Sequence, residues 1–176
     1  MRKLNVEEMG RIDVETFRRS TKLPLVMVLD NVRSLHNVGS VFRTADAFRL
    51  EGLYLCGITA TPPSAEIHKT ALGAEDSVAW HYVEATAEAA RSLQKEGYIV
   101  LAVEQVEGSY KLDTFEFDTN QRYALVMGNE VKGVRQDVVD LCDGALEIPQ
   151  FGTKHSMNVS VTAGIVMWET FRQFAK

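Results

Sequence analysis

Five short apolar runs constrain the fold of this chain more than any other feature. They lie at Leu25–Leu29, Leu53–Cys56, Tyr98–Val103, Tyr123–Met127 and Ala145–Ile148. Their apolar residues are nearly continuous rather than alternating, which is typical of strands that are buried on both faces of a parallel sheet. Helix-prone stretches separate the runs. The alternation predicts an α/β fold, a parallel sheet flanked by helices.

Cap and breaker residues suggest where the helices lie. Residues 1–22 are expected to form a helical extension that carries basic residues, and residues 23–176 a single domain. Thr59–Ser64 is expected to be a loop. Four further helices are expected. The first begins after a cap at Asn37, and the second covers Ala85–Glu96 and ends at Gly97. The third covers Val134–Cys142, and the last runs from Ser156 or Asn158 towards Phe174.

Composition narrows the class of protein. The chain has 176 residues, which suits one domain with a sizeable core. No apolar run approaches the ~20 residues that a membrane-spanning helix needs. Cys56 and Cys142 are far apart, form no metal motif, and are expected to be reduced and buried. These features favour a cytoplasmic location.

The net charge of −5 argues against a general nucleic-acid coat protein. Basic residues are frequent before Arg49, whereas acidic residues dominate the middle of the chain. This distribution is compatible with one basic face on an acidic protein, and equally with ordinary solvated surfaces.

Three polar, glycine-bearing blocks follow or flank the apolar runs, at His36–Asp46, Val126–Gly133 and Ile148–Val159. The second block lacks the Lys and Ser/Thr of a phosphate-binding P-loop, and the chain contains no G-x-G-x-x-G dinucleotide fingerprint. In order and content, the three blocks resemble the signature motifs of SpoU-type (TrmH-like) RNA ribose 2′-O-methyltransferases of the SPOUT superfamily. Thr70–Glu75 also resembles a segment of this family, and the resemblance runs from about Leu25 to the C-terminus.

This resemblance implies a SPOUT fold with a C-terminal trefoil knot, S-adenosyl-L-methionine as cofactor, a homodimer, and methylation of a ribose 2′-hydroxyl in RNA. The compact build favours tRNA as the substrate. The alternatives are rRNA, a catalytically silent RNA-binding or assembly factor on the same scaffold, and methylation of a base instead of the ribose.

The family motifs also imply the site residues. The expected catalytic residues are Arg43, Asn37, Glu130, Ser156 and Asn158. Arg43 would bind a phosphate and lower the pKa of the hydroxyl. Asn37 would have an orienting role, and Glu130 would help to close the active site. The expected cofactor-binding residues are Val103, Glu104, Gly128, Asn129, Ile148, Gln150, Ser156 and Met157.

Structural roles compete with several of these assignments. Arg43 could form a surface ion pair with Asp46. Ser156 and Asn158 could cap the last helix, and Asn129 could cap the helix after its turn. The third motif also departs from the family, because Gln150 stands where Met is common and Met157 where Leu is common.

The last predicted helix is apolar around most of its circumference, from Val159 to Phe174. A helix of this kind is buried on several sides. It is therefore either a central core helix or a helix with one side covered by a second subunit. Arg43 falls opposite the apolar stripe of its own helix, so we expect it to point away from its own sheet.

Overall fold

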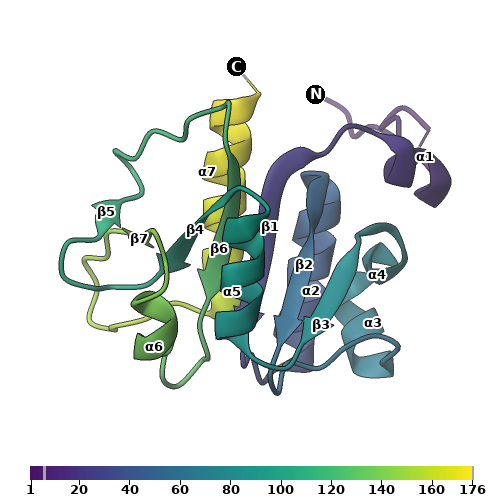
Figure 1. Cartoon of the computed structure of the whole chain (residues 1–176). Coiled ribbons are helices and arrows are strands. Elements are labelled where there is room, and N and C mark those ends of the chain that lie inside the picture. Colours follow the sequence, from purple (N-terminus) through teal and green to yellow (C-terminus); the bar gives the residue numbers. More distant parts are fainter. Residues whose placement is uncertain (6, 176) are drawn as a thin grey trace.

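The computed structural model describes residues 1–5 and 7–175; Val6, within the predicted extension, and the terminal Lys176 lie outside the described residues. A seven-stranded sheet forms the centre, in the order β3-β2-β1-β6-β4-β7-β5 (Figure 1). All of its strand pairings are parallel. The strands are β1 (Leu23–Asp30), β2 (Leu50–Cys56), β3 (Trp80–Val83), β4 (Tyr98–Val103), β5 (Tyr110–Lys111), β6 (Arg122–Met127) and β7 (Gly144–Glu147).

The five apolar runs are confirmed as strands β1, β2, β4, β6 and β7. In β1, Leu25, Met27 and Leu29 pack into one core, while Val26 and Val28 pack into a second core on the opposite face. This two-sided burial is why the run does not alternate. The short edge strands β3 and β5 were not predicted, because neither contains an apolar run.

Helices cover both faces of the sheet (Figure 1). They are α1 (Val14–Arg19), α2 (Leu35–Ala47), α3 (Ala65–Ala71), α4 (Ala74–Ser77), α5 (Thr86–Lys95), α6 (Gln136–Val139) and α7 (Val159–Phe174). Buried residues of α2, α3 and α7 share the core of one face, and those of α5 and α6 share the core of the other.

Two helix starts differ from the prediction. Ser34, not Asn37, caps α2, because its side chain accepts a hydrogen bond from the Asn37 backbone N–H. Helix α6 covers only Gln136–Val139 and is much shorter than the predicted Val134–Cys142. Asn158 caps α7 as expected, whereas Ser156 does not cap it.

Within its described part, the predicted N-terminal extension contains one short helix, α1. Phe17 of this helix is buried in the main core, and Arg18 donates a hydrogen bond to the carbonyl of Asp76. The division of the chain at residue 22 remains a prediction. Across the described part of the chain, no helix combines the length and apolarity needed to cross a membrane.

Parallel strands bring their carboxyl ends to the same edge of the sheet, and ligands bind there in open α/β folds. At this edge, the segments that follow β1, β4, β6 and β7 meet. Three of these segments contain or adjoin the polar blocks predicted from the sequence. The fold thus places these blocks next to one another.

Candidate active site

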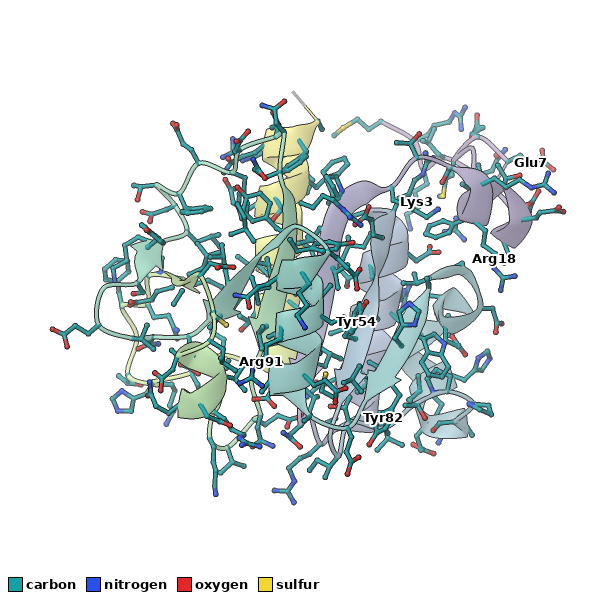
Figure 2. All side chains as sticks on the ribbon, in the orientation of Figure 1. Lys3, Glu7, Arg18, Tyr54, Tyr82 and Arg91 are labelled. Atoms are coloured by element: carbon teal, nitrogen blue, oxygen red, sulfur yellow. The ribbon has the colours of Figure 1, made fainter. Side chains whose placement is uncertain are left out.

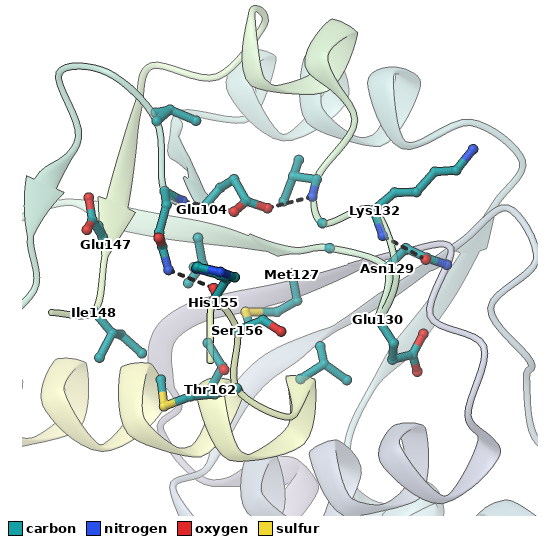
Figure 3. Close-up of a pocket in the computed structure, with 18 of the residues that line it drawn as sticks. Glu104, Met127, Asn129, Glu130, Lys132, Glu147, Ile148, His155, Ser156 and Thr162 are labelled. Atoms are coloured by element: carbon teal, nitrogen blue, oxygen red, sulfur yellow. Dashed lines mark hydrogen bonds between the residues drawn. The ribbon is translucent and has the colours of Figure 1, made fainter. Parts of the chain in front are cut away.

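A cavity of about 470 Å³ lies at the carboxyl ends of β4, β6 and β7 (Figure 3). This volume falls within the range of roughly 300–1,000 Å³ that is typical of small-molecule sites. The cavity is lined by all of the residues predicted to bind the cofactor: Val103, Glu104, Gly128, Asn129, Ile148, Gln150, Ser156 and Met157. Residues that are over 40 positions apart in sequence therefore converge on one site.

The segment after β6 forms a closed turn along one wall of the cavity. The backbones of Asn129 and Gly133 exchange two hydrogen bonds, of 3.0 and 2.9 Å. Gly133 has a φ of +67°, a conformation that side chains other than glycine rarely adopt. An added Cβ at Gly128 would overlap the backbone of Gly133 and Val134, so this close return requires glycine there too.

Asn129 holds this turn and does not cap a helix. Its Oδ1 accepts hydrogen bonds from the backbone N–H groups of Val131 and Lys132, at 2.9 and 3.3 Å. Its Nδ2 donates to the carbonyl of Asn31, at 2.7 Å, which links the turn to the end of β1. Helix α6 begins only at Gln136, so the alternative role as helix cap is wrong.

Two consecutive residues after β4 connect the two loops that enclose the cavity (Figure 3). Glu104 Oε2 accepts a hydrogen bond from the Val134 backbone N–H at 2.9 Å, and Gln105 Nε2 donates to the carbonyl of His155 at 3.1 Å. Gln105 was not predicted to be part of the site. The feature of the sequence that could have indicated this role is its position just after the end of a predicted strand.

The loop between β7 and α7 forms the opposite wall. Gln150, His155, Ser156 and Met157 line the cavity, and the loop lies outside helix and strand. Its backbone amides and carbonyls are therefore not committed to regular pairing. Such groups, next to Ile148 and Met157, are suited to hydrogen-bonding the edge of a flat heterocycle and packing on its faces.

Three of the predicted catalytic residues form one hydrogen-bonded network at the start of α2. The Asn158 amide donates to Asn37 Oδ1 at 3.1 Å, and the Asn37 amide donates to Glu130 Oε1 at 3.2 Å. Asn158 Oδ1 also caps α7 by accepting from the Ser160 N–H at 2.9 Å. The capping role of Asn158 and its contact with the site therefore coexist.

Glu130 serves as an anionic acceptor beside the start of α2. Its two carboxylate oxygens accept hydrogen bonds from the backbone N–H groups of Arg33 and Ser34, at 2.9 and 3.0 Å. Burial alone would raise the pKa of Glu130, but the backbone hydrogen bonds from Arg33 and Ser34 outweigh burial and lower that pKa. A carboxylate held ionised in this way is a weak proton acceptor.

Arg43 is the one predicted site residue that the fold does not bring to the cavity or to the network. It lies on α2, six residues beyond Asn37, and its side chain is exposed. Asp46 accepts a hydrogen bond from Ser77 Oγ at 2.5 Å. Among the described residues Arg43 has no ion pair with Asp46 or with any other carboxylate.

The cavity is acidic. Its lining includes three glutamates, namely Glu104, Glu130 and Glu147, but only one lysine, Lys132. A triphosphate would meet repulsion from these carboxylates, whereas a cationic ligand would be attracted. Neither cysteine lines the cavity, and burial raises the pKa of both Cys56 and Cys142 to about 12, which disfavours the reactive thiolate.

These observations define a class of protein: a parallel α/β protein with a small-molecule site at the carboxyl edge of the sheet, enclosed by a glycine turn and a polar loop. Comparison with known proteins gives the family. The model of the SpoU rRNA methylase family matches residues 24–168. The chain belongs to this family.

Among curated relatives, the chain is 35% identical over 150 residues to the 23S rRNA (guanosine-2′-O-)-methyltransferase RlmB of Neisseria meningitidis serogroup B. The match covers 85% of this chain but 59% of that protein. The chain thus spans about three fifths of the length of this relative.

Solved structures share the fold. An AdoMet-bound rRNA methyltransferase from Sinorhizobium meliloti matches with a TM-score of 0.77 and 28% identity, over 88% of this chain and 61% of that chain. A TrmH/SpoU tRNA modifying enzyme from A. aeolicus matches with a TM-score of 0.78 and 27% identity, over 91% of this chain and 79% of that chain. The predicted family is thereby confirmed.

Proposed function

We propose that this protein methylates a ribose 2′-hydroxyl in RNA with S-adenosyl-L-methionine as the methyl donor. The observation that carries the proposal is the convergence of all eight predicted cofactor residues on one acidic cavity. S-adenosyl-L-methionine has a net positive charge and an adenine ring, and both suit this lining. Membership of the SpoU family and the AdoMet-bound neighbour support the same ligand.

rRNA is the favoured substrate, in place of the tRNA expected from the compact build. The support comes from the names of the family and of the relatives, which are rRNA methyltransferases at 30–36% identity. The A. aeolicus neighbour is a tRNA modifying enzyme, so the fold serves both kinds of RNA.

The residues of the cavity supply binding and orientation. Backbone groups of the lining residues Gln150, Ser156 and Met157 and of the turn at Gly128–Gly133 would hold the adenosine part, while Ile148 and Met157 pack on the ring. The carboxylates of Glu104 and Glu130 would favour the cationic part of the ligand. When bound, the donor supplies an electrophilic methyl group on a sulfonium sulfur.

Transfer forms a carbon–oxygen bond at the 2′-oxygen, breaks the carbon–sulfur bond, and releases the hydroxyl proton. The protein must align the hydroxyl with the methyl and favour loss of the proton. Arg43 suits this role as a permanent cation that binds the adjacent phosphate and lowers the pKa of the hydroxyl. Asn37 and Asn158 would orient the acceptor beside the network that ends at Glu130.

We also propose that the chain acts as a homodimer through α7. Its apolar residues Val161, Ile165 and Trp168 are 54%, 37% and 52% exposed and follow one another at helical spacing. Helices α2 and α7 pack on the same face of the sheet, so a partner on α7 would approach Arg43. We further propose that the chain contains the trefoil knot of the family, formed by the loops on either side of β7.

A direct experiment tests the cofactor and the acceptor separately. Calorimetry should detect S-adenosyl-L-methionine binding without RNA; binding of ATP or NAD in its place would contradict the proposal. After the methylated nucleotide is mapped in rRNA, an RNA with one 2′-deoxy substitution at that position should bind but accept no methyl group, because phosphates dominate affinity. Continued labelling of the deoxy RNA would indicate base methylation.

A further inference from the structure

Phe151 is 97% exposed, and within the described residues only the terminal Met1 among the large hydrophobic side chains is more exposed. Burial of an aromatic side chain stabilises a fold by roughly 2–3 kcal/mol. Because Phe151 is not buried in the single chain, it does not contribute this stabilisation. The stability of the fold therefore does not explain an aromatic residue at this position.

The placement of Phe151 relates it to the cavity. The loop leaves the cavity wall at Gln150 and returns at His155, both of which line the cavity, while residues 151–154 are exposed. The hydrogen bond from Gln105 Nε2 to the carbonyl of His155, 3.1 Å long, anchors the part of the loop that returns to the cavity (Figure 3). Phe151 therefore lies in the exposed part of an anchored loop, directly next to the cavity-lining Gln150.

Three exposed basic residues lie on segments that line or adjoin the cavity, in contrast to the carboxylates of its lining. Lys154 lies in the same loop as Phe151, and Lys132 lies on the facing turn and lines the cavity. Arg33 is next to the cavity because its backbone N–H bonds Glu130. All three side chains are exposed, and in the described part of the chain none of them forms an ion pair, so their charges are available to an anion.

We propose that Phe151 is a base-stacking residue for single-stranded RNA, and that Lys154, Lys132 and Arg33 hold the phosphates on either side of the stacked base. The inference rests on the proposed function. An exposed aromatic ring together with exposed cations is the combination that binds unpaired nucleotides, since every base offers a flat face and every linkage a negative charge. A 2′-hydroxyl that reaches the cavity belongs to the stacked nucleotide or to its immediate neighbour.

The surroundings of Phe151 favour RNA over a protein partner. Its loop neighbours Gln150, Gly152, Thr153 and Lys154 provide no continuous apolar surface. The apolar stripe suited to a second copy lies elsewhere, on α7. An exposed ring with polar neighbours and a lysine in the same loop suits stacking on a base better than it suits an apolar interface.

The test uses the full chain and a short single-stranded RNA of mixed sequence that carries one 2-aminopurine. The Phe151→Ala variant should bind this RNA roughly 5–150-fold more weakly, the range that corresponds to 1–3 kcal/mol per stacked base. Phe151→Trp should retain affinity, and its added indole fluorescence should be quenched by the RNA. Phe151→Leu, which is apolar but cannot stack, should bind as weakly as the alanine variant.

Tyr82→Ala provides a matched control, because Tyr82 is an exposed aromatic residue on β3, at the opposite edge of the sheet (Figure 2). It should bind RNA like the unmodified protein. Affinity for S-adenosyl-L-methionine should be unchanged in every Phe151 variant. Normal RNA binding by Phe151→Leu or by Phe151→Ala would overturn the stacking role, and so would a changed oligomeric state in Phe151→Ala.

Failure of the proposed function is distinguishable from failure of this inference. If the protein transfers no methyl group to cellular RNA but loses RNA affinity on Phe151→Ala substitution and keeps it on Phe151→Trp substitution, the stacking role stands and the enzymatic proposal falls. If methyl transfer is intact and the alanine variant has the normal KM for RNA, the stacking role falls alone.

Discussion

At the scale of single residues, three of the predicted catalytic residues form one network, whereas Arg43 lies apart from it and from the cavity. Asn37, Glu130 and Asn158 are joined by hydrogen bonds of 3.2 and 3.1 Å, and Glu130 reaches the cavity. Arg43 remains exposed and free of ion pairs in the described part of the molecule. An arginine without a structural partner is available to a phosphate.

Replacement of Arg43 tests its catalytic role. Arg43→Ala should reduce turnover by roughly 10²–10⁴-fold, while the affinity for S-adenosyl-L-methionine stays nearly unchanged, because Arg43 lies outside the cavity. Arg43→Lys should restore little activity, since lysine lacks the planar pair of donors that fits a phosphate. Single-turnover kinetics and calorimetry measure the two effects. Near-normal turnover of the alanine variant would leave Arg43 as an ordinary surface residue.

Glu130 should make a pH-dependent contribution to stability. Its folded-state pKa is lowered, because backbone hydrogen bonds from Arg33 and Ser34 outweigh the effect of burial. A carboxylate with a lowered pKa stabilises the fold above its unfolded-state pKa of about 4.3, and this contribution is lost as the pH falls through the folded-state pKa.

Glu130→Gln should therefore lower the free energy of unfolding by about 1 kcal/mol at neutral pH, a value reduced by the exposure of the group. The difference from the unmodified protein should shrink as the pH falls below about 4. Urea denaturation of both proteins at neutral pH and below pH ~4 measures this difference in the free energy of unfolding. Glu88→Gln, at an exposed carboxylate of α5, should cause no comparable change; a loss at Glu130 that is independent of pH would contradict the assignment.

At the scale of elements, the turn at Gly128–Gly133 depends on its backbone. Gly133 combines a φ of +67° with a position at which an added Cβ would overlap Glu104 Oε2. Gly133→Ala should destabilise the protein by roughly 1–3 kcal/mol and weaken cofactor binding, because both strain and overlap distort the cavity wall. Thermal denaturation and calorimetry measure these effects.

Gly152→Ala is the matched control for this substitution in the facing loop. Gly152 has no atom within 4 Å of an added Cβ and does not require a left-handed conformation. The control variant should keep normal stability and cofactor affinity. If Gly133→Ala behaved like Gly152→Ala, the turn would not form part of the cofactor site.

The elements also indicate what the sequence can and cannot predict. The strands β1, β2, β4, β6 and β7 were predictable because burial on both faces leaves an unbroken apolar run. The edge strands β3 and β5 were not, since none of their residues is fully buried. Asn37 was assigned as a helix cap because its residue type is a good cap, but Ser34 lies three residues earlier and takes that role.

The candidate site was predictable to a similar extent. Motifs placed the polar blocks, and the rule that parallel strands end at one edge predicts that the blocks meet there. Pairwise contacts such as Gln105 with His155 depend on loop conformation and were not predictable. The family motifs assign Arg43 a role but do not place it near a cavity.

At the scale of the whole molecule, two exposed features on one face of the sheet point to a second copy of the chain. The α7 stripe of Val161, Ile165 and Trp168 is apolar and exposed, and α2, which carries Arg43, packs beside α7. Ile165→Glu should therefore shift the protein towards monomers in sedimentation, while Tyr82→Glu, at the far edge strand, should not. An unmodified protein that is monomeric at micromolar concentration would contradict the dimer.

A mixture of the Arg43→Ala and Gly133→Ala variants, assayed at a cofactor concentration at which neither variant alone shows appreciable turnover, tests whether each active site is shared between subunits. Arg43→Ala leaves the cavity intact, and Gly133→Ala leaves Arg43 intact. If Arg43 of one subunit serves the cofactor site of its partner, a heterodimer contains one complete site. Statistical exchange makes half of the dimers mixed, so about one quarter of the unmodified activity should return. If Arg43 acted on the cavity of its own chain, every site in the mixture would lack one component, and activity would stay at the level of the separate variants.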